Sequence, residues 1–449
     1  MNRSIFLAPL LLSSILFAQT APAELPPAPA VTAELVTPAT PLAAETPASV
    51  VQSADVQFND KREESDMEAL RRWLQDKRFV SLKEIGGDLS ISGEVRTEAQ
   101  FFNEKSKAQG SSEYIKQRGE NSATGKPSLA WDVEFNLMMD YRTDRTWAAV
   151  KVEFDNDMGI RSGTVSKVRL EKAYLGGRLL PGDTFTWDAE IGRRNLFNVF
   201  DSRIEFSALF DGVLTRFGKA FDQIGDFYAN IGAFLVNDNW NHYGEVMEIG
   251  ALRVANVGLN LKYSIINWYK PLPQSEVPQR WRFLVNQFLA SYQFYPEWIG
   301  KRLIKFYGAG LINVLAQDVV QTGMTKQNVG WYTGVSIGLV KKAGDFAIDA
   351  NYQWVQGQAV PDVDAAGIGR GNAAGVGFYT TNINGSGAPT TQETAQGNGN
   401  FKGFEVDVLY ALTNNITIEQ NFKFSVPLNK TIGPDFRYKQ WELEFIYAF

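Results

Sequence analysis

The chain has 449 residues, with 44 Lys and Arg, 50 Asp and Glu, and a formal net charge of −6. It contains no cysteine and a single histidine, His242, which excludes a disulfide framework, a thiolate metal site, a cysteine nucleophile and any metal site built from two histidines. The mildly acidic balance gives no support to a nucleic-acid-binding surface, and a hydrophobic content of 44% excludes a disordered chain.

The amino terminus has the pattern of a secretory signal peptide. Arg3 precedes an apolar run from residue 5 to Ala18, and small residues with prolines follow, ending in an Ala-Pro-Ala tripeptide at Ala23. A membrane anchor is the alternative, but the run is too short to cross about 30 Å of hydrocarbon and two serines interrupt it. We expect residues 1–23 to be a signal peptide, cleaved after Ala18 or after Ala23. No other stretch of 18 apolar residues occurs, so a mature protein embedded in a membrane would not cross it with helices.

Residues 24–60 are rich in Ala, Pro, Thr and Val, which predicts an extended Pro/Ala-rich linker. Residues 61–80 are predicted to form a short amphipathic helix, because Ser65 or Asp66 can cap it and basic residues gather near its end. Its apolar stripe could serve an oligomerising coil or a periplasmic contact. Two turns do not establish a coiled coil, so we favour a helix that lies against the rim of the following domain.

From residue 87 onward, apolar residues recur at every second position, as in GDLSISGEVRTEAQFF, LAWDVEFNLMMDY and KQWELEFIYAF. Alternation of this kind predicts a strand with one apolar and one polar face. Sixteen such strands are predicted, at residues 87–101, 128–142, 146–155, 167–177, 183–194, 208–218, 226–237, 245–255, 257–267, 281–293, 302–314, 329–341, 345–355, 401–412, 415–425 and 437–449.

The connections between these strands alternate in length. Long connections such as 102–127, 156–166, 195–207 and 356–400 follow odd-numbered strands, and short ones such as RTDRT, KKAG and LTNN follow even-numbered strands. Short turns at one end, long loops at the other and aromatic residues near the strand ends are typical of barrels in membranes, where a closed sheet pairs every backbone group. The sequence therefore predicts an all-β fold: a transmembrane antiparallel β-barrel of about 16 strands over residues 85–449, preceded by the spacer and the short helix.

These features together resemble the Gram-negative outer-membrane porins. The signal peptide, the size of the barrel and the terminal aromatic of FIYAF at Phe449 carry the resemblance, which covers about residues 87–449. The segment WDAEIGRRNLFNVFDSRIEFSALFDGVLTRF is similar to the strand, loop and strand around a porin constriction, and its loop also follows the fifth predicted strand. The linker, the helix and the lack of an acidic loop motif depart from general porins.

The resemblance implies a water-filled channel in the outer membrane for passive diffusion of small hydrophilic solutes and ions, with a constriction formed by the loop after the fifth strand. It implies contacts with outer-membrane lipids and lipopolysaccharide, and assembly by the barrel-assembly machinery through Phe449. A homotrimer is possible. No cofactor, metal ion or nucleic acid is expected.

Charged residues with inward phase are the candidates for the pore. The candidates for the constriction are Arg193, Arg194, Asp201, Arg203 and Glu205. The candidates for the remaining pore lining are Glu94, Arg96, Glu98, Asp132, Glu134, Lys151, Glu153, Arg169, Asp188, Glu190 and Arg216. Rings of charge set ion preference, whereas the alternative is a solvated lining without such a role. Acidic residues are in excess, which indicates a weak cation preference unless the arginines reverse it.

Other functions have weaker support. An enzyme would need an activated serine, but no G-x-S-x-G string occurs and His242 lies in a predicted external loop, so we expect no enzymatic activity. The stretch DVDAAGIGRGNAAGVGF matches no phosphate-binding loop and predicts a flexible external loop, in which Asp362 and Asp364 lack the other ligands of a calcium loop. A plugged structural or adhesive surface barrel and a substrate-specific channel for anionic solutes remain as alternatives.

Overall fold

The computed structural model describes residues 80–84, 87–107, 111–123, 125–159, 167–182, 185–238, 241–270, 282–319, 322–361, 363–366, 368, 379–380, 394–395, 399–432 and 435–449. The chain divides into two units, Met1–Val51 and Gln52–Phe449, and every described residue belongs to the second. The predicted signal peptide (1–23) and linker (24–60) lie outside the described residues. So does the predicted helix over 61–80, except that Val80 begins a strand. Within the described ranges, no helix is both long enough and apolar enough to cross a membrane.

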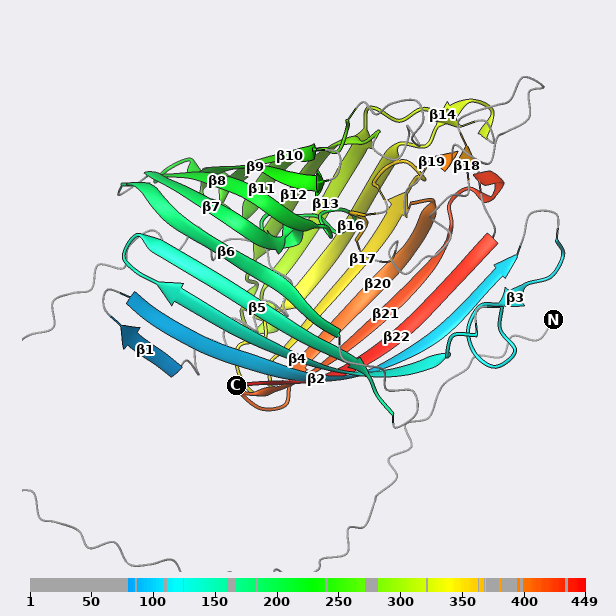
Figure 1. Ribbon diagram of the computed structural model, residues 1–449, viewed down its shortest axis with the longest axis horizontal. Helices are drawn as coiled ribbons and strands as arrows, with labels where there is room; N and C mark the ends of the chain where they lie inside the picture. Colours follow the sequence, from blue (N-terminus) through cyan, green and yellow to red (C-terminus); the bar gives the residue numbers. More distant parts are fainter. Residues whose placement is uncertain are drawn as a thin grey trace, which may run out of the picture. The chain divides into compact units, whose positions relative to one another are not determined.

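Sixteen antiparallel strands of the described part close into a barrel, and each overlaps one of the sixteen predicted strands. In order around the barrel they are β2 (Gly87–Lys107), β4 (Leu129–Arg142), β5 (Thr146–Asp157), β6 (Lys167–Pro181), β7 (Phe185–Asn195), β8 (Leu209–Phe221), β9 (Gly225–Asn237), β10 (His242–Leu252), β11 (Leu259–Asn267), β12 (Leu284–Phe294), β13 (Ile304–Asn313), β16 (Val329–Gly338), β17 (Phe346–Val355), β20 (Phe401–Ala411), β21 (Ile416–Pro427) and β22 (Asp435–Ala448). The last strand closes the barrel by pairing with the first, from Glu94 opposite Ala448 to Lys107 opposite Asp435 (Figure 1).

Short elements decorate this barrel. Strand β1 (Val80–Glu84) forms a hairpin with the start of β2, and β3 (Ile115–Lys116) pairs near its end. Two small hairpins interrupt long connections, and the remaining elements are single 3-10 turns. Their bounds are β14 (Asp318–Val319), β15 (Thr325–Lys326), β18 (Tyr379–Thr380), β19 (Thr394–Ala395), η1 (Leu196–Asn198), η3 (Val254–Asn256), η4 (Glu297–Ile299) and η7 (Lys430–Ile432).

The outer face of the barrel is apolar. Side chains of Leu175, Phe288 and Phe306 are more than half exposed, at 60%, 54% and 54%, and similar residues follow around most of the strands. Soluble monomers rarely leave apolar patches of more than a few hundred Å² on their surface. An apolar outer band with polar residues inside is the arrangement expected for a barrel surrounded by lipid.

The inner face differs from one side of the barrel to the other. The inner side of β8 to β16, called the packed wall below, contributes to one apolar cluster. Its members from these strands are Phe210, Leu214, Phe234, Val246, Ile266, Val285, Leu289, Tyr307, Ala309, Leu311 and Tyr332. The inner side of β17, β20–β22, β2 and β4–β7, called the charged wall, carries many carboxylates, arginines and lysines among other polar side chains.

The seam between β2 and β22 depends on a glycine. Phe449 continues the pairing beyond β22, because its N–H donates to the Gly93 carbonyl and the Gly93 N–H donates to the Phe449 carbonyl, both at 2.9 Å. A Cβ atom at Gly93 would lie 2.7 Å from the ring of Phe449, so a residue without a side chain at this position leaves room for the ring. The ring then stacks against Phe135 of β4.

Candidate pore and its inward loop

The connection after β7, residues 196–208, lies inside the barrel and is called the inward loop below. It opens with the turn η1, and its apolar side chains join the cluster of the packed wall. Phe200 and Phe206 are 2% and 0% exposed and contact each other with ring centroids 5.3 Å apart. Burying each of these rings contributes about 2–3 kcal/mol relative to exposure. Phe206 has a φ of 72°, an uncommon region for a bulky residue, so the packing of its ring compensates for local strain.

Polar contacts attach the tip of the inward loop to the same wall. The Asp201 carboxylate accepts from Lys262 Nζ at 2.7 Å, and the Asp201 N–H donates to Glu248 Oε2 at 3.1 Å. Gln287 binds the loop twice, because its Nε2 donates to the Asp201 carbonyl at 2.8 Å and its Oε1 accepts from Ser202 Oγ at 2.7 Å. Three neighbouring strands, β10, β11 and β12, therefore hold Asp201 in a fixed position.

Arg203 is the loop residue that reaches the charged wall. Its guanidinium lies 2.9 Å from Asp349 Oδ2 on β17 and stands over the Tyr307 ring, 5.4 Å from the centroid. Burial alone would lower the pKa of Arg203, but Asp349, Tyr307, Asp407 and Glu405 raise it well above its ordinary value. The side chain is 26% exposed, so a permanent positive charge remains in contact with solvent inside the barrel.

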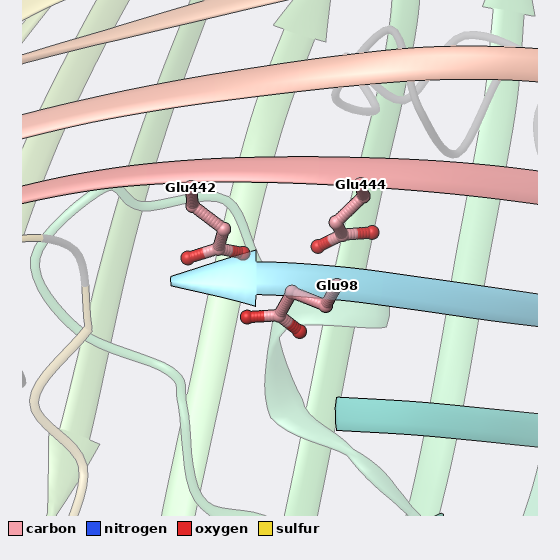
Figure 2. A group of neighbouring side chains, drawn as sticks. All are labelled: Glu98, Glu442 and Glu444. Atoms are coloured by element: carbon pink, nitrogen blue, oxygen red, sulfur yellow. The ribbon is translucent and has the colours of Figure 1, made fainter. Parts of the chain in front are cut away.

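Carboxylates continue from Asp349 along β20, β21, β22 and β2. Lys423 Nζ lies 3.5 Å from Glu405, and Asn421 donates to both Glu405 and Asp407. Figure 2 shows the carboxyl groups of three further residues turned toward one another, and their oxygens lie within 4.8 Å: Glu98, Glu442 and Glu444.

Among the described residues, these three glutamates are the grouping that could hold a metal ion. Each already accepts a hydrogen bond from a neighbouring side chain. Gln100 donates to Glu98, Gln440 donates to Glu442 at 2.6 Å, and Arg96 donates to Glu444 at 3.4 Å. The group is therefore partly satisfied by the protein, and it places three carboxyl groups side by side on the wall.

Beyond Arg96 the charges alternate in sign. Arg96 contacts Glu94 at 3.0 Å, Arg169 contacts Glu153, Lys151 contacts Glu171, and Arg178 contacts Asp188 at 3.0 Å. The row ends at Glu190, which accepts from Arg194 and from Arg216, the latter at 3.0 Å. Arg194 is 7% exposed, so it supports the wall by this pair more than it offers charge to the lumen.

The register places the eleven lining candidates of the sequence analysis on this charged inner face or at its junction with β8. Glu94, Arg96 and Glu98 of β2 stand opposite Asn136, Glu134 and Asp132 of β4, and the row continues through β5, β6, β7 and β8. The inward loop spans residues 196–208 and therefore contains the three remaining constriction candidates: Asp201, Arg203 and Glu205. Glu205, however, is 1% exposed and faces away from open solvent.

Two predictions about single residues are wrong. Arg193 lies on the outer face, where it forms two hydrogen bonds of 2.7 Å with Asp211 beside the exposed Ile191 and Val213, because neighbouring residues of a strand point to opposite sides. His242 is not an exposed loop residue: it begins β10, is 1% exposed, and its Nε2 lies 3.1 Å from the Trp268 carbonyl.

The Gly-rich stretch also departs from expectation where it is described. Asp364 is buried rather than held in an exposed loop, and Asp362 lies outside the described residues. Sequence reasoning missed Asp349, Glu405, Asp407 and Lys423, although all four alternate with apolar residues in FAIDANYQWV, FKGFEVDVLYA and ITIEQNFKFSVP. Their inward phase was the available signal.

No protein-family model and no curated protein matches the chain. Solved structures with a similar fold include Pseudomonas putida OprB at high pH, with 11% identity over 86% of this chain and 97% of that chain and a TM-score of 0.45. Salmonella typhi OmpF in complex with daunomycin has 12% identity over 82% and 100%, with a TM-score of 0.46. A triple mutant of the Rhodopseudomonas blastica porin has 6% identity over 80% and 100%, with a TM-score of 0.41.

All three TM-scores lie below 0.5, so the fold is assigned from the chain itself. Its closed ring of strand pairings defines a sixteen-stranded antiparallel barrel.

Proposed function

We propose that the protein is an outer-membrane channel for the passive diffusion of small hydrophilic solutes and ions. A barrel of sixteen strands is wide enough to leave an aqueous channel, and the outer apolar face suits lipid. The single observation that carries the proposal is Arg203, a charged side chain 26% exposed to solvent although it lies within a ring of sixteen strands.

The inward loop is proposed to form the constriction. Arg203 and Asp201 stand at the loop, and the carboxylates of the charged wall stand across from it. Solutes would pass between the loop and the charged wall, in a transverse field that favours polar over apolar molecules. Carboxylates outnumber cationic groups in the described contacts of that wall, so the channel is expected to prefer cations, which argues against a channel specific for anionic solutes.

A plugged structural or adhesive barrel is the second candidate. The apolar cluster fills the space between the inward loop and the packed wall, which is the arrangement that a plug would need. Conductance separates the two functions.

The full chain in a planar lipid bilayer should give stepwise, ohmic conductance that uncharged solutes of increasing size reduce up to a cut-off. A silent bilayer with correctly folded, heat-modifiable barrel would overturn the channel and favour the plugged barrel. A homotrimer, and recognition of Phe449 by the barrel-assembly machinery, stay predictions.

A further inference from the structure

Two described stretches of the connection after β17, residues 356–361 and 363–366, lie against the inward loop and are called the strap below. The Ser207 N–H donates to the Asp364 carbonyl at 3.2 Å, and the Ala366 N–H donates to the Ile204 carbonyl at 2.7 Å. Ser207 Oγ also donates to the Ala365 carbonyl at 2.8 Å. Loop and strap are therefore joined backbone to backbone, although about 160 residues separate them in the chain.

The join also has an apolar part. Ala359, Val360 and Ala365 of the strap are 0%, 1% and 5% exposed, and they belong to the same cluster as Phe200 and Phe206 of the loop. The strap therefore packs against the loop within this cluster.

Two carboxyl groups are enclosed where the strap meets the loop. Glu205 and Asp364 are 1% and 0% exposed. Asp364 Oδ1 accepts from the Ala208 N–H at 3.1 Å. Among the described residues, both carboxyl oxygens of Glu205 and the second oxygen of Asp364 have no hydrogen-bond partner. Enclosing an ionised carboxylate without a partner is far more costly than enclosing a neutral carboxyl group.

The charged groups nearby do not neutralise this pair. Glu248 on β10 approaches Glu205 and adds negative charge, while its own oxygens accept from Tyr228 and from the Asp201 N–H. Lys262 on β11 is bonded to Asp201 at 2.7 Å. The site therefore favours neutral carboxyl groups.

Resting on the channel function proposed above, we propose that the strap is a latch for the inward loop. The latch is closed while Glu205 and Asp364 are enclosed as neutral carboxyl groups, and it opens when they release their protons to the water of the lumen.

The sign of the pH effect follows from the two protonation states. Burial raises the pKa of Asp364 to about 7, and burial followed by the charges of Asp364 and Glu248 raises the pKa of Glu205 well above its ordinary value. A released loop exposes both groups to water, where they ionise near pH 4. The closed state holds the extra protons, so its stability is complete at acidic pH. Asp364 makes the closed state about tenfold less favourable per pH unit from about pH 4 to about pH 7. Glu205 extends this loss to higher pH.

The first test measures single-channel conductance of the full chain at several pH values from about 5 to about 9. The unaltered chain should show a smaller, quieter conductance at the acidic end and a larger or noisier one at the alkaline end. Asp364→Asn keeps the shape and the acceptor for Ala208 but cannot ionise, so the rise in conductance with pH should be smaller, and Glu205→Gln should act in the same direction. With both substitutions together the conductance should stay small across the range. Asp318→Asn, at an exposed position of another external hairpin, should behave as the unaltered chain.

A second measurement does not depend on conduction. The chain has no cysteine, so Ser207→Cys introduces a single thiol at the join. Its rate of modification, divided by that of an exposed Ser111→Cys reference at the same pH, should rise by about tenfold or more between about pH 5 and about pH 7, and should stay flat when Asp364→Asn and Glu205→Gln are both added.

The outcomes separate the two proposals. If neither the conductance nor the relative modification rate of a heat-modifiable barrel changes with pH, the latch is overturned and the channel stands. A silent bilayer with pH-dependent modification would overturn the channel and support the latch. If Asp364→Asn fails to fold, Glu205→Gln and the pH dependence of the unaltered chain carry the same test.

Discussion

The packed wall and the charged wall belong to one barrel and follow the same alternation, yet their inner faces do opposite things. On the packed wall the inward positions hold Phe210, Leu214 and Phe234, and these residues can be covered only if another segment lies on them. On the charged wall the inward positions hold residues such as Glu98 and Arg96, which remain satisfied when water reaches them. A strand's period therefore decides which residues face inward, whereas their chemistry decides which side of the barrel a loop can cover.

The largest expected effect comes from removing the packing of the inward loop. Phe200→Ala should cost about 3–5 kcal/mol of local packing, because the ring is buried and the cluster cannot close the cavity fully. The loop should then leave the packed wall, and single-channel conductance should rise and become noisy. Phe197→Ala is the matched control, since Phe197 in the same loop is 51% exposed. Equal conductance in the two variants would show that the packed wall does not hold the loop.

The carboxylates of the charged wall should dominate ion preference. The triple variant Glu98→Gln, Glu442→Gln, Glu444→Gln replaces three neighbouring carboxyl groups by amides of the same size and so removes whatever negative charge the group carries. The reversal potential under a salt gradient should shift toward anions, with a several-fold fall in the ratio of cation to anion permeability. Glu245→Gln provides the control, because Glu245 is exposed on the outer face. A shift in the control alone would place the conducting path elsewhere.

A smaller and opposite shift is expected from the inward loop. Arg203→Ala removes one positive charge at the proposed constriction, so the reversal potential should move toward cations. Because Arg203 is paired with Asp349, part of the shift in reversal potential should come from rearrangement of the Asp349 carboxylate after its partner is removed. Arg193→Ala removes an arginine from the outer face and should leave the reversal potential unchanged. A shift from Arg193→Ala equal to that from Arg203→Ala would contradict the assignment of faces.

The smallest effect concerns the seam within the charged wall. Gly93→Ala brings a Cβ atom to 2.7 Å from the ring of Phe449, which can move at a cost of about 1 kcal/mol. The temperature at which the barrel loses its heat-modifiable form should fall slightly, while single-channel conductance stays constant. Gly310→Ala, with open space around the added atom, should leave both unchanged.

Deleting Phe449 should lower the yield of assembled barrel, and a normal yield in the outer membrane would argue against its assembly role.

Most of the fold was predictable from the sequence because two-residue periodicity is a local signal. Within each strand, the alternation of apolar and polar residues indicates which side chains share a face. The alternation of short and long connections indicates the order of the strands around the ring. The charged lining followed from the same phase. Consecutive residues are the weak point of such reasoning: the sequence analysis assigns both Arg193 and Arg194 to the constriction, although one strand cannot aim both into the lumen.

The docking of the inward loop and the strap was beyond local signals. Ser207 and Asp364 meet across a long separation in the chain, and no periodicity relates them. The available hint was a break in the rule itself, because Phe210, Leu214 and Phe234 are apolar at inward positions. Apolar residues on both faces of neighbouring strands indicate a covered surface, but they do not identify the segment that covers it.

The pairing of β2 with β22 has a consequence for biogenesis. One edge of β2 pairs with β22 over Glu94–Lys107, so the ring cannot shut until the chain has been made as far as β22. A prematurely terminated copy would keep that edge open and would not make a sealed cylinder. The residues that close the ring are separated by nearly the whole barrel sequence, so closure is expected to be a slow, late step of folding. A chain that lacks β22 is therefore not expected to form an open pore in the membrane.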